Sequence, residues 1–139
     1  MPETLVYKKV FNFLPISVNH AYYFIKMKTG RVIKVKTKEC KEFVEKVSAD
    51  IPESILTEDK LRVHLTFHFP YKNKPKRHDL DNIQKIMLDA LSGKIWKDDT
   101  QIYHLITKKI DYRAETIQKG IGLTIIEVYK YEKETKTLA

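Results

Sequence analysis

The sequence predicts an α+β domain in which a mixed β-sheet packs against two main helices. Three segments support this prediction: residues 61–69 alternate between apolar and polar side chains, while residues 38–51 and 80–91 repeat apolar side chains at three- and four-residue intervals. Alternation is typical of a strand with one buried face, and the longer interval places one apolar stripe along a helix. No internal repeat or linker is visible in the 139 residues, so we expect a single domain over residues 1–139.

The first part of the chain is expected to hold a strand, a hairpin and the first helix. Residues 5–13 alternate in character, and residues 24–35 form two strand-like runs joined at Gly30, where glycine supplies the positive φ of a tight turn. The helical stripe that follows consists of Cys40, Phe43, Val44, Val47 and Ile51. Pro52 interrupts this pattern.

The strand at residues 61–69 is the clearest single element. Its apolar positions are Leu61, Val63, Leu65, Phe67 and Phe69. His64 and His68 lie on its polar face, and neither a cysteine nor a further histidine stands at ligand spacing. We therefore expect a solvated sheet face here and no zinc site.

The second helix is expected to begin near Asp81 and to end at Gly93. Its apolar stripe consists of Leu80, Ile83, Met87, Ala90 and Leu91. Asp81 and Gln84 have the spacing of a capping box with an acidic N-cap, and Gly93 suits a left-handed C-cap. Further strands are expected over residues 101–110 and 121–131, with a frayed tail over residues 132–139.

The composition favours a polyanionic partner. The chain has 26 Lys and Arg against 18 Asp and Glu, which gives a formal net charge of +8. Its single cysteine, Cys40, excludes an intrachain disulfide, and no apolar run resembles a secretory signal or a membrane span. We expect a cytoplasmic protein without a membrane partner, and nucleic acid is the first candidate ligand.

Two pairs of aspartates flank the second helix, Asp79 with Asp81 before it and Asp98 with Asp99 after it. In an extended segment that enters a helix the first two fall on one face, where their carboxylates repel unless a cation lies between them. Mg²⁺ prefers carboxylate and water oxygens. The first pair is therefore a candidate half of a Mg²⁺ site. The second pair can complete it if the chain doubles back along a helix of about 18 Å.

Lys85 lies one helical turn after Asp81 on the same face. It either stabilises the charge of a phosphate under attack, or belongs to a row of surface ion pairs with Asp81 and Asp89. Nearby cations favour the first interpretation, because a pure binding module gains nothing from carboxylates beside bound phosphates. These candidate DNA-binding residues are Lys72, Lys74, Lys76 and Arg77.

Residues 77–99, RHDLDNIQKIMLDALSGKIWKDD, resemble the signature of the RusA family of Holliday junction resolvases. The shared features are a basic lead-in, D-L-D-N, a lysine four residues after the second aspartate, an apolar helix with D-A-L, and W-x-D-D. The stretches LPISVNHAYY and LRVHLTFHFP extend the resemblance more weakly, from about Phe13 to Ile110. The resemblance implies a RusA-like homodimeric endonuclease that needs Mg²⁺ and cuts branched DNA, the four-way junction, by paired incisions that leave 5′-phosphate and 3′-hydroxyl ends.

The resemblance also implies residue roles. Asp79, Asp81 and Asp99 would be the catalytic, metal-binding carboxylates and Lys85 the catalytic lysine. Asp98 can share the metal, support its ligands or face solvent. Asn19 lies in the loop that looks like the family's proline, serine and asparagine loop, and it can bind phosphate or shape that loop.

A homodimer fits a four-way junction, because two-fold symmetry presents two identical sites to two opposed strands. Tyr22, Tyr23 and the terminal strands are candidates for its interface, and the sequence does not select among them. Pro75 and His78 depart from the family pattern within the basic lead-in, which bears on the grip on DNA and leaves the acids unaffected.

Two rival functions remain open. One is a nuclease of different structure selectivity, which cuts flaps or replication forks with the same residues. The other is a junction-binding protein without catalysis, whose DNA binding falls steeply with salt and needs no Mg²⁺.

Overall fold

The computed structural model describes residues 4–16, 21–69, 80–110 and 122–132. Its main sheet has the strand order β1-β6-β4-β5, with β1 at Leu5–Phe11, β4 at Leu61–His68, β5 at Ile102–Ile110 and β6 at Leu123–Lys130. Strands β4 and β5 are parallel, whereas the β1–β6 and β4–β6 pairs are antiparallel. The predicted mixed sheet is confirmed.

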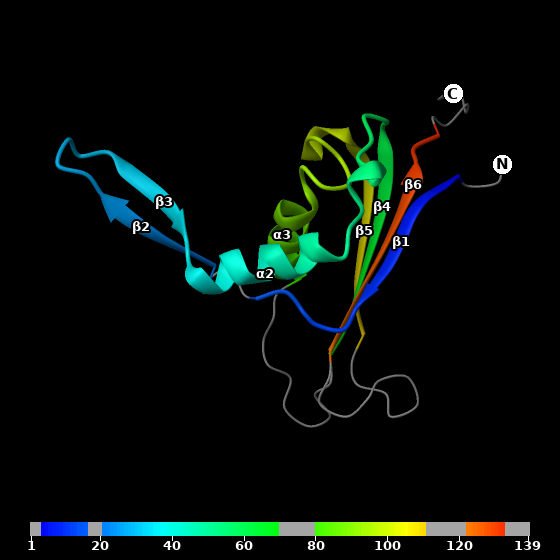
Figure 1. Ribbon diagram of the computed structural model, residues 1–139, viewed down its shortest axis with the longest axis horizontal. Coiled ribbons are helices and arrows are strands. Elements are labelled where there is room, and N and C mark those ends of the chain that lie inside the picture. Colours follow the sequence, from blue (N-terminus) through cyan, green and yellow to red (C-terminus); the bar gives the residue numbers. More distant parts are fainter. Residues whose placement is uncertain (1–3, 17–20, 70–79, 111–121, 133–139) are drawn as a thin grey trace, which may run out of the picture.

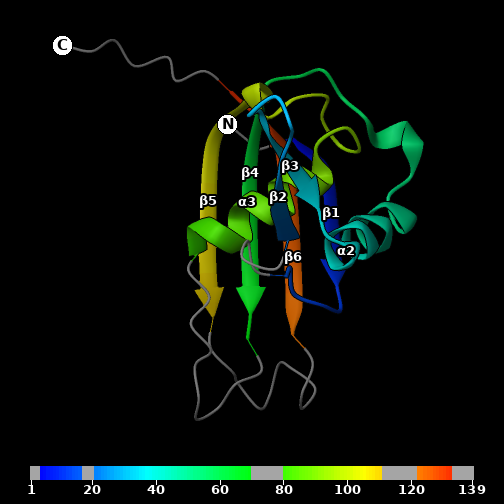
Figure 2. The same ribbon diagram turned by 90° about the vertical axis from the view of Figure 1, so that its left-hand side faces the viewer.

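Both predicted helices are confirmed and lie on one side of the sheet, α2 at Lys38–Ala49 and α3 at Leu80–Leu91 (Figure 1). Helix α3 connects the parallel strands β4 and β5, because a parallel pair needs a crossover. Figure 2 shows α3 running obliquely across β5 and β4. None of the helices in the described part of the chain is long and apolar enough to cross a membrane.

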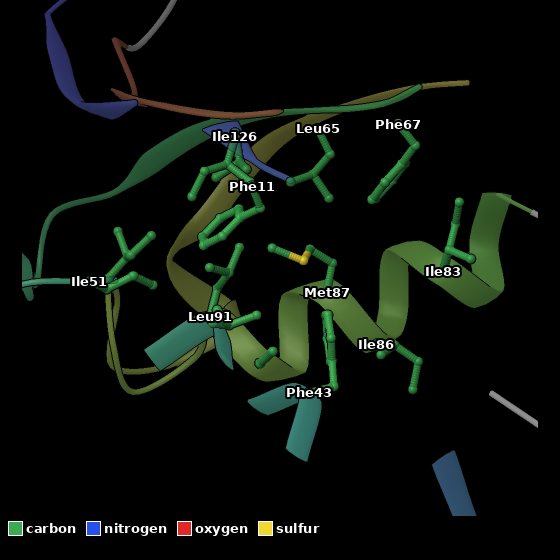
Figure 3. Close-up of a cluster of buried hydrophobic side chains, with 14 of the residues drawn as sticks. Phe11, Phe43, Ile51, Leu65, Phe67, Ile83, Ile86, Met87, Leu91 and Ile126 are labelled. Atoms are coloured by element: carbon green, nitrogen blue, oxygen red, sulfur yellow. The ribbon is translucent and has the colours of Figure 1, made fainter. Parts of the chain in front are cut away.

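The core lies between the sheet and the two helices (Figure 3). The apolar positions of β4 alternate with half-buried polar ones as predicted, and Leu61, Val63, Leu65 and Phe67 have no exposed surface. In α3, Ile83, Ile86, Met87, Ala90 and Leu91 are buried. Each large side chain of this kind contributes about 1.5–3 kcal/mol by leaving water, which fixes how α3 is rotated about its axis.

The predicted capping box of α3 is wrong. The helix begins at Leu80, so Asp81 lies inside its first turn, where Asp81 Oδ1 accepts a hydrogen bond of 3.0 Å from the amide of Asn82. The side chain of Gln84 reaches β5 instead, and its Oε1 accepts a hydrogen bond of 2.5 Å from the hydroxyl of Thr107. The predicted stop at Gly93 is consistent with its φ of 84°.

The polar face of β4 is less solvated than predicted. His64 and His68 are half-buried, and burial lowers the pKa of His68. The ring of Tyr129 on β6 packs against this face, with its centroid 5.4 Å from that of His64 and 4.7 Å from the guanidinium carbon of Arg62. The Tyr129 ring therefore shields part of this face from solvent.

A second, two-stranded sheet projects away from the main body (Figure 1). It is the predicted hairpin, made of β2 at Tyr22–Lys26 and β3 at Val32–Lys36, and Gly30 adopts a φ of 87° in its turn. The amide of Thr37 donates a 2.9 Å hydrogen bond to the carbonyl of Ala21 and closes the base. The predicted tail falls outside the described residues from position 133 onward.

Candidate active site

Helix α3 presents a row of charged side chains to solvent. Asp81, Lys85 and Asp89 are exposed, while Ile83 and Met87 on the other side of the helix are buried. Residues four positions apart in a helix share one face, so the buried stripe holds this row toward solvent. Asp81 and Lys85 are thus one turn apart at the start of α3, as predicted.

The row is not a chain of ion pairs. In the described residues, Lys85 makes no ion pair within 4 Å with either Asp81 or Asp89. Asp89 instead accepts a hydrogen bond of 3.0 Å at Oδ2 from the hydroxyl of Tyr22, at the base of the hairpin. Burial, and then this bond to Asp89, raises the pKa of the Tyr22 hydroxyl, so it remains a donor. The ammonium group of Lys85 and the carboxylate of Asp81 are left available to a ligand.

The Asp98-Asp99 pair lies in a structured turn before β5. Asp98 is the N-cap of the short 3-10 helix η2, Asp99–Gln101, and the capping box that was expected at α3 occurs here, between Asp98 and Gln101. The Asp98 carboxylate accepts a hydrogen bond of 3.1 Å from the amide of Thr100. Asp98 therefore faces solvent, one of the roles left open for it, and it also caps η2, a role that was not expected.

Asp99 is oriented by a buried indole. Its Oδ1 accepts a hydrogen bond of 2.7 Å from Nε1 of Trp96, whose side chain is fully buried. Asp99 itself is exposed, and its second oxygen makes no hydrogen bond with the described residues. The indole N–H holds one carboxylate oxygen and leaves the other oxygen free to bind an ion. Groups outside the coordination shell of a metal orient its ligands in this way.

Asp81 and Asp99 do not meet within one chain. The first turn of α3 contacts β5 at Thr107, through Gln84, whereas Gln101 is held at the beginning of that strand by the carbonyls of Thr57 and Asp59. Positions 101 and 107 are six residue steps apart, which is roughly 20 Å at about 3.3 Å per step along a strand. The condition that the chain doubles back and brings Asp99 to the start of α3 is therefore not met within a single chain.

No group of three His, Cys, Asp or Glu that could hold a metal occurs among the described residues. Asp79 lies outside them, so its place beside Asp81 stays a prediction. The other predicted residues outside the described part are the DNA-binding candidates Asn19, Lys72, Lys74, Lys76 and Arg77, together with Pro75 and His78. Asp81 and Asp99 nevertheless offer the oxygen donors that Mg²⁺ prefers, on elements fixed by buried side chains.

Sequence reasoning missed two features. One is the bond from Trp96 to Asp99, although the spacing W-x-x-D was visible in the sequence. The other is the clustering of positive charge on one face of the hairpin. The lysines alternate with apolar residues in the sequence, so this pattern could have predicted their common face.

Comparison with known proteins shows the family of the chain. A model of the family described as Endodeoxyribonuclease RusA matches residues 15–125, which is most of the chain. A comparison with curated protein sequences finds no significant match. The matched range contains both helices, the hairpin, β4, β5 and every acid discussed above.

Proposed function

The chain belongs to the RusA endodeoxyribonuclease family, and from that premise we propose that it resolves four-way DNA junctions by Mg²⁺-dependent hydrolysis of two opposed phosphodiester bonds. We further propose a role in DNA recombination and repair. Beyond the family match, the observation that best supports this function is the exposed pair of Asp81 and Lys85 at the start of α3. Neither side chain forms an ion pair with the residues that the structure describes.

Each residue of the proposed site has a distinct task. Asp79, Asp81 and Asp99 would hold Mg²⁺, which when bound lowers the pKa of a coordinated water and offsets phosphate charge. Lys85 would stabilise the additional negative charge on the phosphate as water attacks. Water adds to phosphorus while the P–O3′ bond breaks, and the departing oxygen takes up a proton. The products are a 5′-phosphate and a 3′-hydroxyl.

We propose that the site is shared between two subunits. Asp81 and Asp99 lie near opposite ends of α3 in one chain, too far apart to bind one ion directly. A two-fold dimer can place Asp99 of the partner subunit beside Asp79 and Asp81, and symmetry then completes the second site in the same way. Dimerisation would therefore be required for metal binding as well as for paired cutting.

One face of the hairpin has the composition of a dimer contact. The strand register places Tyr23 opposite Val35 and Ile25 opposite Ile33, so these four apolar side chains share a face. Tyr23, Ile25 and Ile33 are 47%, 43% and 38% exposed in the single chain. A two-stranded sheet is marginally stable alone, so covering this face with a second copy would stabilise the hairpin.

A charge on this apolar face should separate the subunits. We expect Ile25→Asp to shift the protein from dimer to monomer at micromolar concentration, because an unpaired carboxylate would be buried at the contact. Light scattering coupled to size-exclusion chromatography measures this change. Leu56→Asp is the matched control, since Leu56 is also 43% exposed but lies outside the hairpin. A dimeric Ile25→Asp protein would place the interface elsewhere.

The proposed function is tested by incubating the purified protein with labelled four-way junction, flap, fork and linear duplex, each with and without Mg²⁺. We expect paired cuts in the junction only when Mg²⁺ is present. Cutting of flaps or forks in preference to junctions would identify a nuclease of different selectivity. Tight junction binding without products would indicate a binding protein and overturn the catalytic proposal.

A further inference from the structure

The hairpin has a second face with a different composition. The register pairs Tyr22 with Lys36, Phe24 with Lys34, and Lys26 with Val32, and alternation places all six side chains on the face opposite Tyr23 and Ile25. We call these six residues the basic face of the hairpin. Three lysines and two aromatic rings therefore share one side of a two-stranded ribbon.

All the charged side chains of the hairpin itself are positive. Residues 21–37 contain no Asp or Glu, and their cations are Lys26, Lys28, Arg31, Lys34 and Lys36. The lysines of the basic face are exposed, and the hairpin projects away from the main body (Figure 1). Two such faces would repel one another, so a second copy of the chain is a poor occupant, whereas a polyanion is a good one.

Phe24 gives this face a second type of binding group. Its side chain is 68% exposed, the largest exposed fraction among the exposed large apolar residues of the described chain. It lies between lysines, directly across from Lys34. An exposed aromatic ring among cations is typical of surfaces that bind unpaired nucleotides. The base stacks on the ring, while the phosphates of the backbone pair with the cations.

The basic face is connected to the candidate active site. The ammonium group of Lys34 lies 3.9 Å from the ring centroid of Tyr22, and the hydroxyl of Tyr22 donates its hydrogen bond to Asp89 of α3. Asp89 belongs to the same exposed helix row as Lys85 and Asp81. A DNA strand on the basic face would therefore lead toward the residues proposed to cut it.

We propose that the basic face of the hairpin binds branched DNA next to the cleavage site, with Lys26 and Lys36 on phosphates and Phe24 stacked on a base exposed at the branch point. This assignment rests on the proposed function. It adds that the protein recognises the base exposed at the branch point of its substrate. The closed duplex offers phosphates but few accessible base faces. Phe24 would therefore contribute to selectivity for branches, and the lysines to affinity for any DNA.

The lysine contribution is tested with the full-length protein and a labelled four-way junction in EDTA, which prevents cutting. The double variant Lys26→Gln with Lys36→Gln should lower the slope of log affinity against log salt by about 1.8, since each lost phosphate contact removes about 0.9. The control, Lys8→Gln with Lys94→Gln, removes the same charge from exposed positions outside the hairpin and should leave the slope unchanged. Equal slopes for the two double variants would overturn the phosphate contacts.

The aromatic contribution is tested by Phe24→Ala and Phe24→Trp. We expect Phe24→Ala to weaken junction binding about tenfold, while binding to linear duplex of the same length changes less than twofold. Phe24→Trp should restore junction binding, because it keeps a stacking surface. Equal losses on junction and duplex, or no loss on either, would overturn the stacking role.

The outcomes separate this inference from the proposed function. A wild-type protein that cuts junctions while all hairpin variants bind like wild type would remove the hairpin from DNA recognition and leave the nuclease proposal standing. A wild-type protein that binds no branched DNA would refute both proposals. Thermal unfolding of each variant confirms that the substituted proteins are folded, which is expected because the replaced side chains are exposed.

Discussion

Asp81→Asn is expected to lower Mg²⁺-dependent cutting of a four-way junction by at least about 100-fold. Loss of a group that merely orients a metal ligand already costs about 10- to 100-fold in affinity or activity, so loss of a ligand's charge should cost no less. Asparagine keeps the shape of the side chain and an oxygen that can accept the bond from the Asn82 amide. Since Asp81 is exposed, we expect the free energy of unfolding to change by less than about 1 kcal/mol.

The measurement is the single-turnover rate of junction cutting at saturating protein, which separates chemistry from DNA binding. Junction affinity in EDTA should not fall, because removing a carboxylate beside bound phosphates relieves repulsion. Glu39→Gln is the control, because Glu39 is the acid in the first turn of α2 as Asp81 is in α3. Undiminished cutting by Asp81→Asn, or an equal loss with Glu39→Gln, would exclude a catalytic role for Asp81.

The elements of the fold follow from local patterns because each one buries a single apolar face. The alternation in β4 and the stripe in α3 are each complete within a single element, and both are buried as predicted except at Leu80, which is half-buried. The hairpin followed from two strand-like runs and Gly30, whose φ of 87° is a conformation that glycine adopts easily. Such signals need no knowledge of distant contacts.

Features that depend on tertiary contacts could not be predicted in this way. Asp81 with Gln84 and Asp98 with Gln101 have the same spacing, but only the second pair forms a capping box. Gln84 bonds to Thr107, a residue on a strand later in the chain. Likewise, the sequence identifies Asp81 and Asp99 as acids, but whether they can meet within one chain depends on the direction in which α3 and β5 run.

Complementation between two inactive variants is expected to show that the acids act across the dimer. Asp81→Asn and Asp99→Asn should each be inactive as homodimers. A mixed dimer of the two carries both substitutions in one shared site and neither in the other, so one complete site remains. We expect this mixed dimer, isolated by two different affinity tags, to nick junctions at about half the wild-type rate without making paired cuts.

The alternative arrangement gives the opposite result, because sites built within single chains would each carry one substitution in the mixed dimer. Such a dimer would be as inactive as its parents. Trp96 supports the shared arrangement, since it fixes Asp99 on the surface with one oxygen bonded and the other unbonded within the described chain. A carboxylate held in this way far from the start of its own α3 can share the proposed metal with Asp81 only if a second subunit brings Asp81 to it.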